Sequence, residues 1–276
     1  MKNAALKIIG LVTLTFVVAC GDDPSAPMIT EIETIVIDGY GVTKTYVTEV
    51  DYRNGNEVDF VRYYEDYRQS AQKSFYYNID TNRINRIDYS YPDSDHDFTI
   101  HAERNGDEQL TRLYNPNTSS ITDIRFSYSQ DRRTSESGTD YRATHTYNSS
   151  GDLENSRKDN YAVSLRWVDG VLNSFRETMY GISFKMTYNY FNDRIFDIYQ
   201  DDIVCNISYD DQGRISEIHT FYIDEVREVI TTYHYREGTV VGVQPTPAFP
   251  GGQYFGMDGK PLTEIPEVSL HGYNVF

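Results

Sequence analysis

Three aspartates at alternate positions form the clearest metal-binding pattern in the sequence. Asp93, Asp95 and Asp97 are spaced as at the start of a calcium-binding loop, where alternate carboxylates supply oxygen ligands. Such a loop needs glycine at its sixth position and glutamate at its twelfth, and these positions hold Phe98 and Arg104. The segment therefore fits a polar hairpin tip better than a calcium loop, and we expect neither a metal nor another cofactor.

Residues that serve in catalysis are scattered along the chain. The sequence contains no Gly-x-Ser-x-Gly, no Cys-x-x-Cys, no phosphate loop and no dinucleotide fingerprint. Ser70 and Lys73 match the Ser-x-x-Lys of penicillin-binding enzymes, but the partner motifs Ser-Asp-Asn and Lys-Thr-Gly are absent. We therefore expect a protein that is not an enzyme. The histidines also lack ligand-spaced pairs; they are His96, His101, His145, His219, His234 and His271.

The first twenty residues predict export and attachment of a lipid. Two lysines lie around the start of an apolar run from Ile8 to Ala19, which is shorter than the ~20 residues of a membrane span and typical of a signal peptide. The run ends in Val17-Val18-Ala19-Cys20. This ending resembles a bacterial lipoprotein signal, which implies removal of residues 1–19 and lipidation of Cys20. The alternative is an ordinary secretory signal with a chance cysteine at its end.

The anchor and the charge together restrict the partners. Residues 20–28 form a short tether, and its acidic residues resemble the surface-export signal of Bacteroidetes-type lipoproteins or serve as a solvated linker. We expect a cell-envelope protein held by Cys20 in the outer membrane, facing the periplasm or the cell surface. Removing residues 1–19 takes away two lysines and no acid, which changes the net charge from −17 to −19. This charge argues against nucleic acid and leaves a neutral glycan or an envelope protein with a basic patch.

Tyrosine is the one residue type whose abundance points to a ligand. The chain has 25 tyrosines, and rings two residues apart on a strand share one face of a sheet. Such a row can stack on a sugar ring while its hydroxyl groups form hydrogen bonds at the rim. Our candidate ligand-binding residues are Trp167, Tyr188, Tyr190 and Tyr209, and the alternative is that the same row forms a core face.

The composition of the body predicts an all-β fold with few or no helices. Tyrosine, isoleucine, valine and threonine are abundant, whereas only six alanines and seven leucines follow residue 19. Apolar residues alternate with polar ones, as in Ile182-Phe184-Met186-Tyr188-Tyr190. In the second half we expect strands at 161–168, 171–179, 182–190, 194–200, 203–209, 214–223 and 227–236.

Turn signals about ten residues apart predict a large antiparallel up-and-down meander of hairpins over residues 29–238, on the order of 15–20 strands. It would form a curved single sheet or a wide barrel, and an outer-membrane barrel is a further alternative because alternation alone does not say which face meets lipid. Residues 239–276 are rich in proline and glycine and either plug or cover one end of the sheet, or lie disordered.

A degenerate repeat accompanies the turns. Its clearest copy runs from Tyr209 to Ile215, with a second copy from Tyr147 to Leu153 and looser ones beginning at Tyr52, Tyr77 and Trp167. Each copy has an aromatic residue, a turn with Asn, Asp or Gly, and an aliphatic residue that opens the return strand. These residues resemble the YD-repeat group and uncharacterised β-rich Bacteroidetes-type lipoproteins. The resemblance brings no catalytic residue, so we expect a binding or assembly lipoprotein, with a structural sheet or a surface glycan hydrolase as alternatives.

Overall fold

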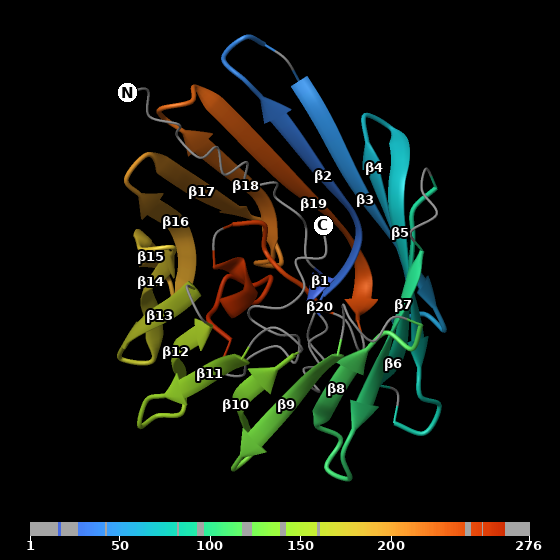
Figure 1. Cartoon of the computed structure of the whole chain (residues 1–276). Helices are drawn as coiled ribbons and strands as arrows, with labels where there is room; N and C mark the ends of the chain where they lie inside the picture. Colours follow the sequence, from blue (N-terminus) through green and yellow to red (C-terminus); the bar gives the residue numbers. More distant parts are fainter. Residues whose placement is uncertain are drawn as a thin grey trace, which may run out of the picture.

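The computed structural model describes residues 16–17, 27–41, 43–81, 83–92, 97–117, 123–138, 142–158, 161–240, 244–249 and 251–262. Eighteen strands, β2 to β19, form one closed antiparallel barrel in which neighbours in sequence are neighbours in space (Figure 1). This confirms the predicted all-β meander and selects the barrel over the open sheet. The first nine strands are β2 (Pro27–Ile37), β3 (Thr43–Arg53), β4 (Glu57–Glu65), β5 (Arg68–Tyr77), β6 (Ile84–Ser90), β7 (Phe98–Arg104), β8 (Leu110–Tyr114), β9 (Asp123–Ser129) and β10 (Arg132–Ser137).

Of the remaining strands, those from β13 onward follow the predicted ranges closely. They are β11 (Arg142–Tyr147), β12 (Leu153–Lys158), β13 (Tyr161–Val168), β14 (Val171–Met179), β15 (Ile182–Phe191), β16 (Arg194–Gln200), β17 (Ile203–Tyr209), β18 (Ile215–Tyr222) and β19 (Arg227–Thr239). The barrel closes where β19 pairs with β2, and there the buried hydroxyl groups of Thr34 and Thr231 lie 3.1 Å apart. In addition to the strands of the wall, β1 (Phe16–Val17) pairs with β20 (Gln244–Pro245), and Gly252–Tyr254 form a 3-10 turn, η1.

A β-bulge recurs in every second strand pair, at one rim of the barrel. In each of these pairs, a residue near the end of one strand is paired with a residue near the start of its partner strand. The partner strand then carries one extra, unpaired residue; for example, Tyr209 pairs with Ile215 and Ser208 with Glu217. In eight of the nine pairs the strand-end residue is aromatic. We call these eight residues the aromatic rim: Tyr52, Tyr77, Tyr128, Tyr147, Trp167, Tyr190, Tyr209 and Tyr235.

The aromatic rim joins each hairpin to its neighbour. Every member donates a side-chain hydrogen bond to a backbone carbonyl at the bulge of the preceding pair; Tyr52 Oη, for example, bonds to Ile29 O at 2.7 Å. Ile29 itself faces Tyr235, so the series continues across the closing pair of strands. Arg104 occupies the ninth position, where its guanidinium group donates to Glu108 O at 2.9 Å. The repeat seen in the sequence is therefore a device that fixes neighbouring hairpins to one another.

The residue after the aromatic one explains why the repeat contains Asp or Asn. The Asp210 carboxylate accepts backbone N–H groups from Gln212 at 3.0 Å and Arg214 at 2.8 Å, which closes the turn. Gly213 in that turn has a φ of 75°, and a Cβ there would also collide with the guanidinium group of Arg194. The Arg194 side chain could move aside, but the positive φ itself favours glycine.

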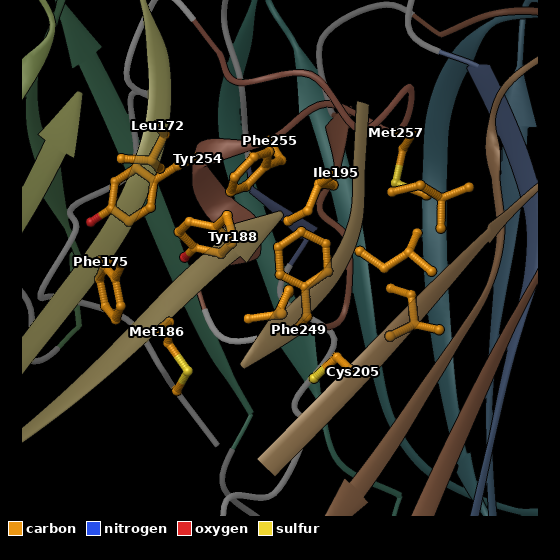
Figure 2. Close-up of a cluster of buried hydrophobic side chains, with 14 of the residues drawn as sticks. Leu172, Phe175, Met186, Tyr188, Ile195, Cys205, Phe249, Tyr254, Phe255 and Met257 are labelled. Atoms are coloured by element: carbon orange, nitrogen blue, oxygen red, sulfur yellow. The ribbon is translucent and has the colours of Figure 1, made fainter. Parts of the chain in front are cut away.

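Residues 244–249 and 251–262, which belong to the proline- and glycine-rich segment after β19, lie inside the barrel (Figures 1 and 2). Phe249, Tyr254, Phe255 and Met257 belong to the same buried cluster as inward side chains from β12 to β19. Backbone bonds fasten the segment to the wall, including Ile215 N to Met257 O at 2.7 Å. The described part of the tail, residues 244–249 and 251–262, is thus a plug that gives the inward apolar face a partner.

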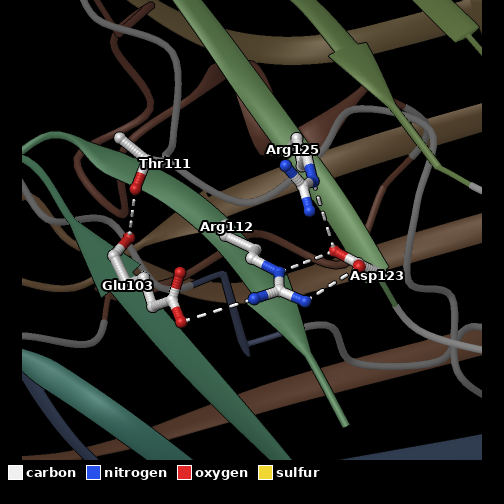
Figure 3. Close-up of polar contacts among 5 residues, drawn as sticks. All are labelled: Glu103, Thr111, Arg112, Asp123 and Arg125. Carbon is white, nitrogen blue, oxygen red and sulfur yellow. Dashed lines mark hydrogen bonds and ion pairs between the residues drawn. The ribbon is translucent and has the colours of Figure 1, made fainter. Parts of the chain in front are cut away.

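The opposite face of the wall is polar and charged. Figure 3 shows Arg112 between two strands, with its guanidinium group 2.7 Å from Asp123 and 3.5 Å from Glu103. Arg62 lies in the same way 3.0 Å from Glu49. A barrel that crosses a membrane presents an apolar band outward, whereas these ion pairs place charged groups on the outer face of β3, β4 and β7 to β9.

Candidate functional site

A hollow of about 470 Å³ opens on the outer wall over four consecutive strands, β11 to β14. Strand alternation explains most of its lining, because every second residue of these strands points away from the apolar interior. Ser156, Tyr161 and Val163 border the hollow, but their side chains point inward. The outward side chains are small and polar, mainly hydroxyl and amide groups. The lining residues are Thr144, Thr146, Asn155, Ser156, Arg157, Tyr161, Ala162, Val163, Ser164 and Thr178.

Hydrogen bonds between strands hold the lining in place. Asn155 Nδ2 donates to Thr146 Oγ1 at 3.2 Å, and Ser164 Oγ donates to Asn155 Oδ1 at 2.9 Å. The register places Asn155 directly opposite both partners, with Thr146 on one side and Ser164 on the other. The Asn155 amide is thus oriented by its neighbours, while the hydroxyl groups of Thr146 and Ser164 keep acceptor capacity toward the hollow.

Cations surround this polar floor. Each of five consecutive strands, β11 to β15, carries one exposed cation on the outer face, and these cations are Arg142, Arg157, Arg166, Arg176 and Lys185. Adjacent strands lie ~4.8 Å apart, so the five Cα positions extend over about 19 Å measured perpendicular to the strands. The register also staggers them along the strands, with Arg142 at one end and Arg166 at the other. We call these five residues the basic band. The site can offer hydrogen-bond donors, acceptors and positive charge, whereas the residues that line the hollow include no Asp, Glu, His or Cys.

The four aromatic residues proposed for ligand binding point into the barrel. Tyr188 is 2% exposed, and its ring lies 5.0 Å from that of Phe255 in the plug (Figure 2). Trp167, Tyr190 and Tyr209 pack against the same buried cluster as members of the aromatic rim. These residues lie on the inward face of the wall, which the plug covers. The structure therefore matches the alternative that the row forms a core face.

The other candidate lipidation, metal-binding and nucleophilic residues either have a structural role or lie outside the described residues. Cys20, Asp93 and Asp95 lie outside them. Asp97 accepts the backbone N–H of Tyr91 at 2.8 Å and the Ser90 hydroxyl at 3.2 Å. Burial raises the pKa of the Cys205 thiol to about 11, as expected for a structural thiol. Within the described ranges, no group of three or more His, Cys, Asp and Glu residues is placed to hold a metal ion.

His145 is part of a buried polar cluster inside the barrel. Its Nδ1 lies 2.9 Å from Ser156 Oγ, and its Nε2 lies 3.3 Å from Glu136 Oε1. Arg133 Nη1 lies 3.3 Å from the same carboxylate oxygen. Glu136 and Ser156 are both fully buried, so this Ser-His-Glu arrangement is closed to substrate and forms a buried polar part of the core.

The sequence carried only a weak signal for the hollow. Its lining comes from the exposed alternate positions of four strands, and these read in the sequence as ordinary solvent-facing residues. The sequence does show that each of the five strands β11 to β15 contains a basic residue. Only the register of the strands shows that these cations lie on one face of neighbouring strands.

Comparisons with known proteins give a likeness of fold. No family model matches the chain, and no curated protein matches it. A solved structure of a porin-like protein from Bacteroides uniformis ATCC 8492 is similar, with 10% identity and a TM-score of 0.43 over 76% of this chain and 99% of that one. The complex TcdB2-TccC3 is also similar, with 10% identity and a TM-score of 0.33 over 82% of this chain and 18% of that one. Neither likeness identifies a ligand for this chain.

Within the described ranges, no helix has the length and apolar character that a crossing of the bilayer requires.

Proposed function

We propose that this chain is a lipid-anchored protein of the cell envelope that binds a carbohydrate in the hollow over β11 to β14 and does not catalyse a reaction. The hollow is the observation that carries the proposal. Its floor offers the hydroxyl groups of Thr146 and Ser164 on either side of the fixed Asn155 amide. Sugar hydroxyl groups both donate and accept, and a floor of hydroxyl and amide groups satisfies both roles.

The same lining favours binding over glycan hydrolysis. Sugar cleavage by the usual mechanism needs two carboxyl groups on opposite sides of the scissile bond. None of the lining residues is acidic. The four strands carry two acidic residues: Glu177 points to the interior side, where it bonds to Tyr161, and Glu154 is exposed at the bulge beside Asn155, so only one carboxyl group lies near the floor. The sequence supports the other half of the proposal, because the anchor at Cys20 would keep the hollow close to the glycans of the envelope.

The proposal is tested with Thr146→Val and Ser164→Ala, which remove hydroxyl groups from the floor with little change in volume. Binding of glycans to residues 28–276 on a glycan array and by calorimetry should weaken at least tenfold in the double variant. Ser127→Ala, on the outer face of β9 away from the hollow, is the matched control and should bind normally. Cys20→Ala should release the protein from membranes. Absence of glycan binding by the parent protein would favour the purely structural alternative.

A further inference from the structure

The basic band has no acidic counterpart. Elsewhere on the outer wall several cations pair with acids, as Arg62 does with Glu49 and Arg86 with Asp88. Among the described residues, no ion pair involves any of the five cations of the basic band. This occurs in a chain with 42 acidic and 25 basic residues, where an acidic neighbour is the expected surrounding for a cation.

The register makes the band unfavourable for the protein alone. Arg176 and Lys185 are direct partners in the pairing of β14 with β15, and like charges placed opposite each other destabilise a sheet. Arg166 is a diagonal neighbour of Arg176, because Ser164 lies directly opposite Arg176 on β13. A sheet that keeps three cations together without an ion pair is suited to receive an anion from outside.

We infer that the ligand of the hollow is an acidic glycan, a chain of sugar units that carry carboxylate or sulfate groups. This inference rests on the proposed function and specifies its ligand class. Four of the five cations are arginines, whose planar guanidinium groups bind carboxylate and sulfate oxygens through two parallel hydrogen bonds. The hydroxyl and amide floor meets the sugar hydroxyl groups, and the basic band meets the charges along the chain over about 19 Å.

The residues present favour a glycan over other polyanions. Single-stranded nucleic acids are held largely by bases stacked on aromatic rings, and the outward side chains of β11 to β14 include no aromatic ring. A lipid headgroup would need exposed apolar side chains beside the cations to insert between acyl chains, and the floor is polar instead. A flexible acidic sugar chain meets both the polar floor and the charged border.

The experiment compares an acidic with a neutral oligosaccharide. Oligogalacturonate and heparin-derived hexasaccharide serve as acidic probes and maltohexaose as the neutral one, each titrated into residues 28–276 by calorimetry. We expect at least one acidic probe to bind at least tenfold more tightly than maltohexaose. Affinity should fall at least tenfold between 50 and 500 mM NaCl, because salt screens exposed charges.

Charge-removing variants locate the site. Arg157→Gln with Arg176→Gln should weaken acidic-probe binding at least tenfold, whereas Arg125→Gln, an exposed arginine on β9, should not change it. Equal binding of maltohexaose, lost with Thr146→Val but kept with the arginine variants, would overturn this inference and leave the proposed function standing. Binding of no glycan would overturn both. Tighter binding of single-stranded DNA or of phosphatidylglycerol vesicles through the same arginines would overturn the assignment to a glycan.

Discussion

Glu136 and Glu49 each face an arginine, yet one pair is buried inside the barrel and the other lies on its outer wall. The Glu136 side chain is fully buried, whereas that of Glu49 is 40% exposed. Removal of one partner of a buried pair leaves an uncompensated charge, which costs several kcal/mol. An exposed pair contributes at most about 1 kcal/mol. The burial of the pair, rather than the residue types that form it, determines how much stability is lost when one partner is removed.

We therefore predict that Glu136→Gln lowers the free energy of unfolding by about 3 kcal/mol, because Arg133 and His145 lose their shared carboxylate. Glu49→Gln, the matched outer variant, should cost less than about 1 kcal/mol. Urea unfolding followed by fluorescence measures both. Similar losses for the two variants would show that the interior cluster does not contribute as a buried charge network.

Single residues also show where sequence reasoning succeeds. Cys205 alternates with two isoleucines, and burial of the thiol follows directly from that pattern. The same alternation could not decide whether the row of Tyr188 and Tyr190 faced a ligand or a core. An alternating pattern shows only that the two faces of a strand differ. The plug determines which face is covered, and it comes from a distant part of the chain.

At the scale of the strand pair, the aromatic rim is the recurring unit. Tyr209 donates to Ile195 O, and the Arg194 guanidinium group lies over its ring at 5.6 Å. A hydrogen bond of this kind contributes about 1 kcal/mol net, and an unsatisfied buried carbonyl adds to the loss. The rim should therefore stabilise the barrel through many similar small contributions.

Tyr209→Phe tests this unit. We predict a loss of about 1 to 2 kcal/mol in the free energy of unfolding, since the ring stays and the bond to Ile195 O disappears. Tyr180→Phe is the control, because Tyr180 is 75% exposed in the turn between β14 and β15, and it should cost less than about 0.5 kcal/mol. A neutral Tyr209→Phe would mean that packing alone holds neighbouring hairpins together.

The strands themselves could be predicted because hairpins are local. The expected range 161–168 matches β13 residue for residue, and 203–209 matches β17. Turn residues with positive φ, such as Gly213, set these limits. The closing pair of β2 with β19 could not be predicted, because its partners lie about 200 residues apart and no turn connects them.

At the scale of the whole molecule, buried phenol groups determine the response to alkali. Burial raises the pKa of Tyr52, Tyr190, Tyr209, Tyr233 and Tyr235 well above 10. Above pH ~10 the unfolded chain releases these protons, whereas the folded chain keeps them. The folded state then binds more protons, so stability falls as pH rises.

We predict that the free energy of unfolding falls by several kcal/mol between pH 10 and pH 11, at up to ~1.4 kcal/mol per pH unit for each such tyrosine. Lys73, whose pKa burial lowers to about 8, acts in the opposite sense between that value and 10.5, but it is one group against many. Urea titrations at intervals from pH 8 to 11, with tyrosinate absorbance as a second readout, measure the effect. A flat profile above pH 10 would contradict it.

The whole-chain charge also shows what composition leaves out. A net charge of −17 points away from an anionic ligand, and it conceals a local surplus of positive charge on β11 to β15. The five cations of the basic band are distributed over five strands between residues 142 and 185. Their proximity exists only after the strands pair, so no window along the sequence contains it.

Closure between β2 and β19 has a consequence for how the chain folds. β2 is the first strand of the barrel and β19 the last, so one edge of β2 lacks its hydrogen-bonding partner until residue 239 is available. Partly formed intermediates must carry two open sheet edges, which are templates for pairing with other chains. Because the closing contact has a very large sequence separation, it makes assembly slow and nearly all-or-none. A chain truncated before β19 should thus leave an aggregation-prone open sheet rather than a smaller barrel.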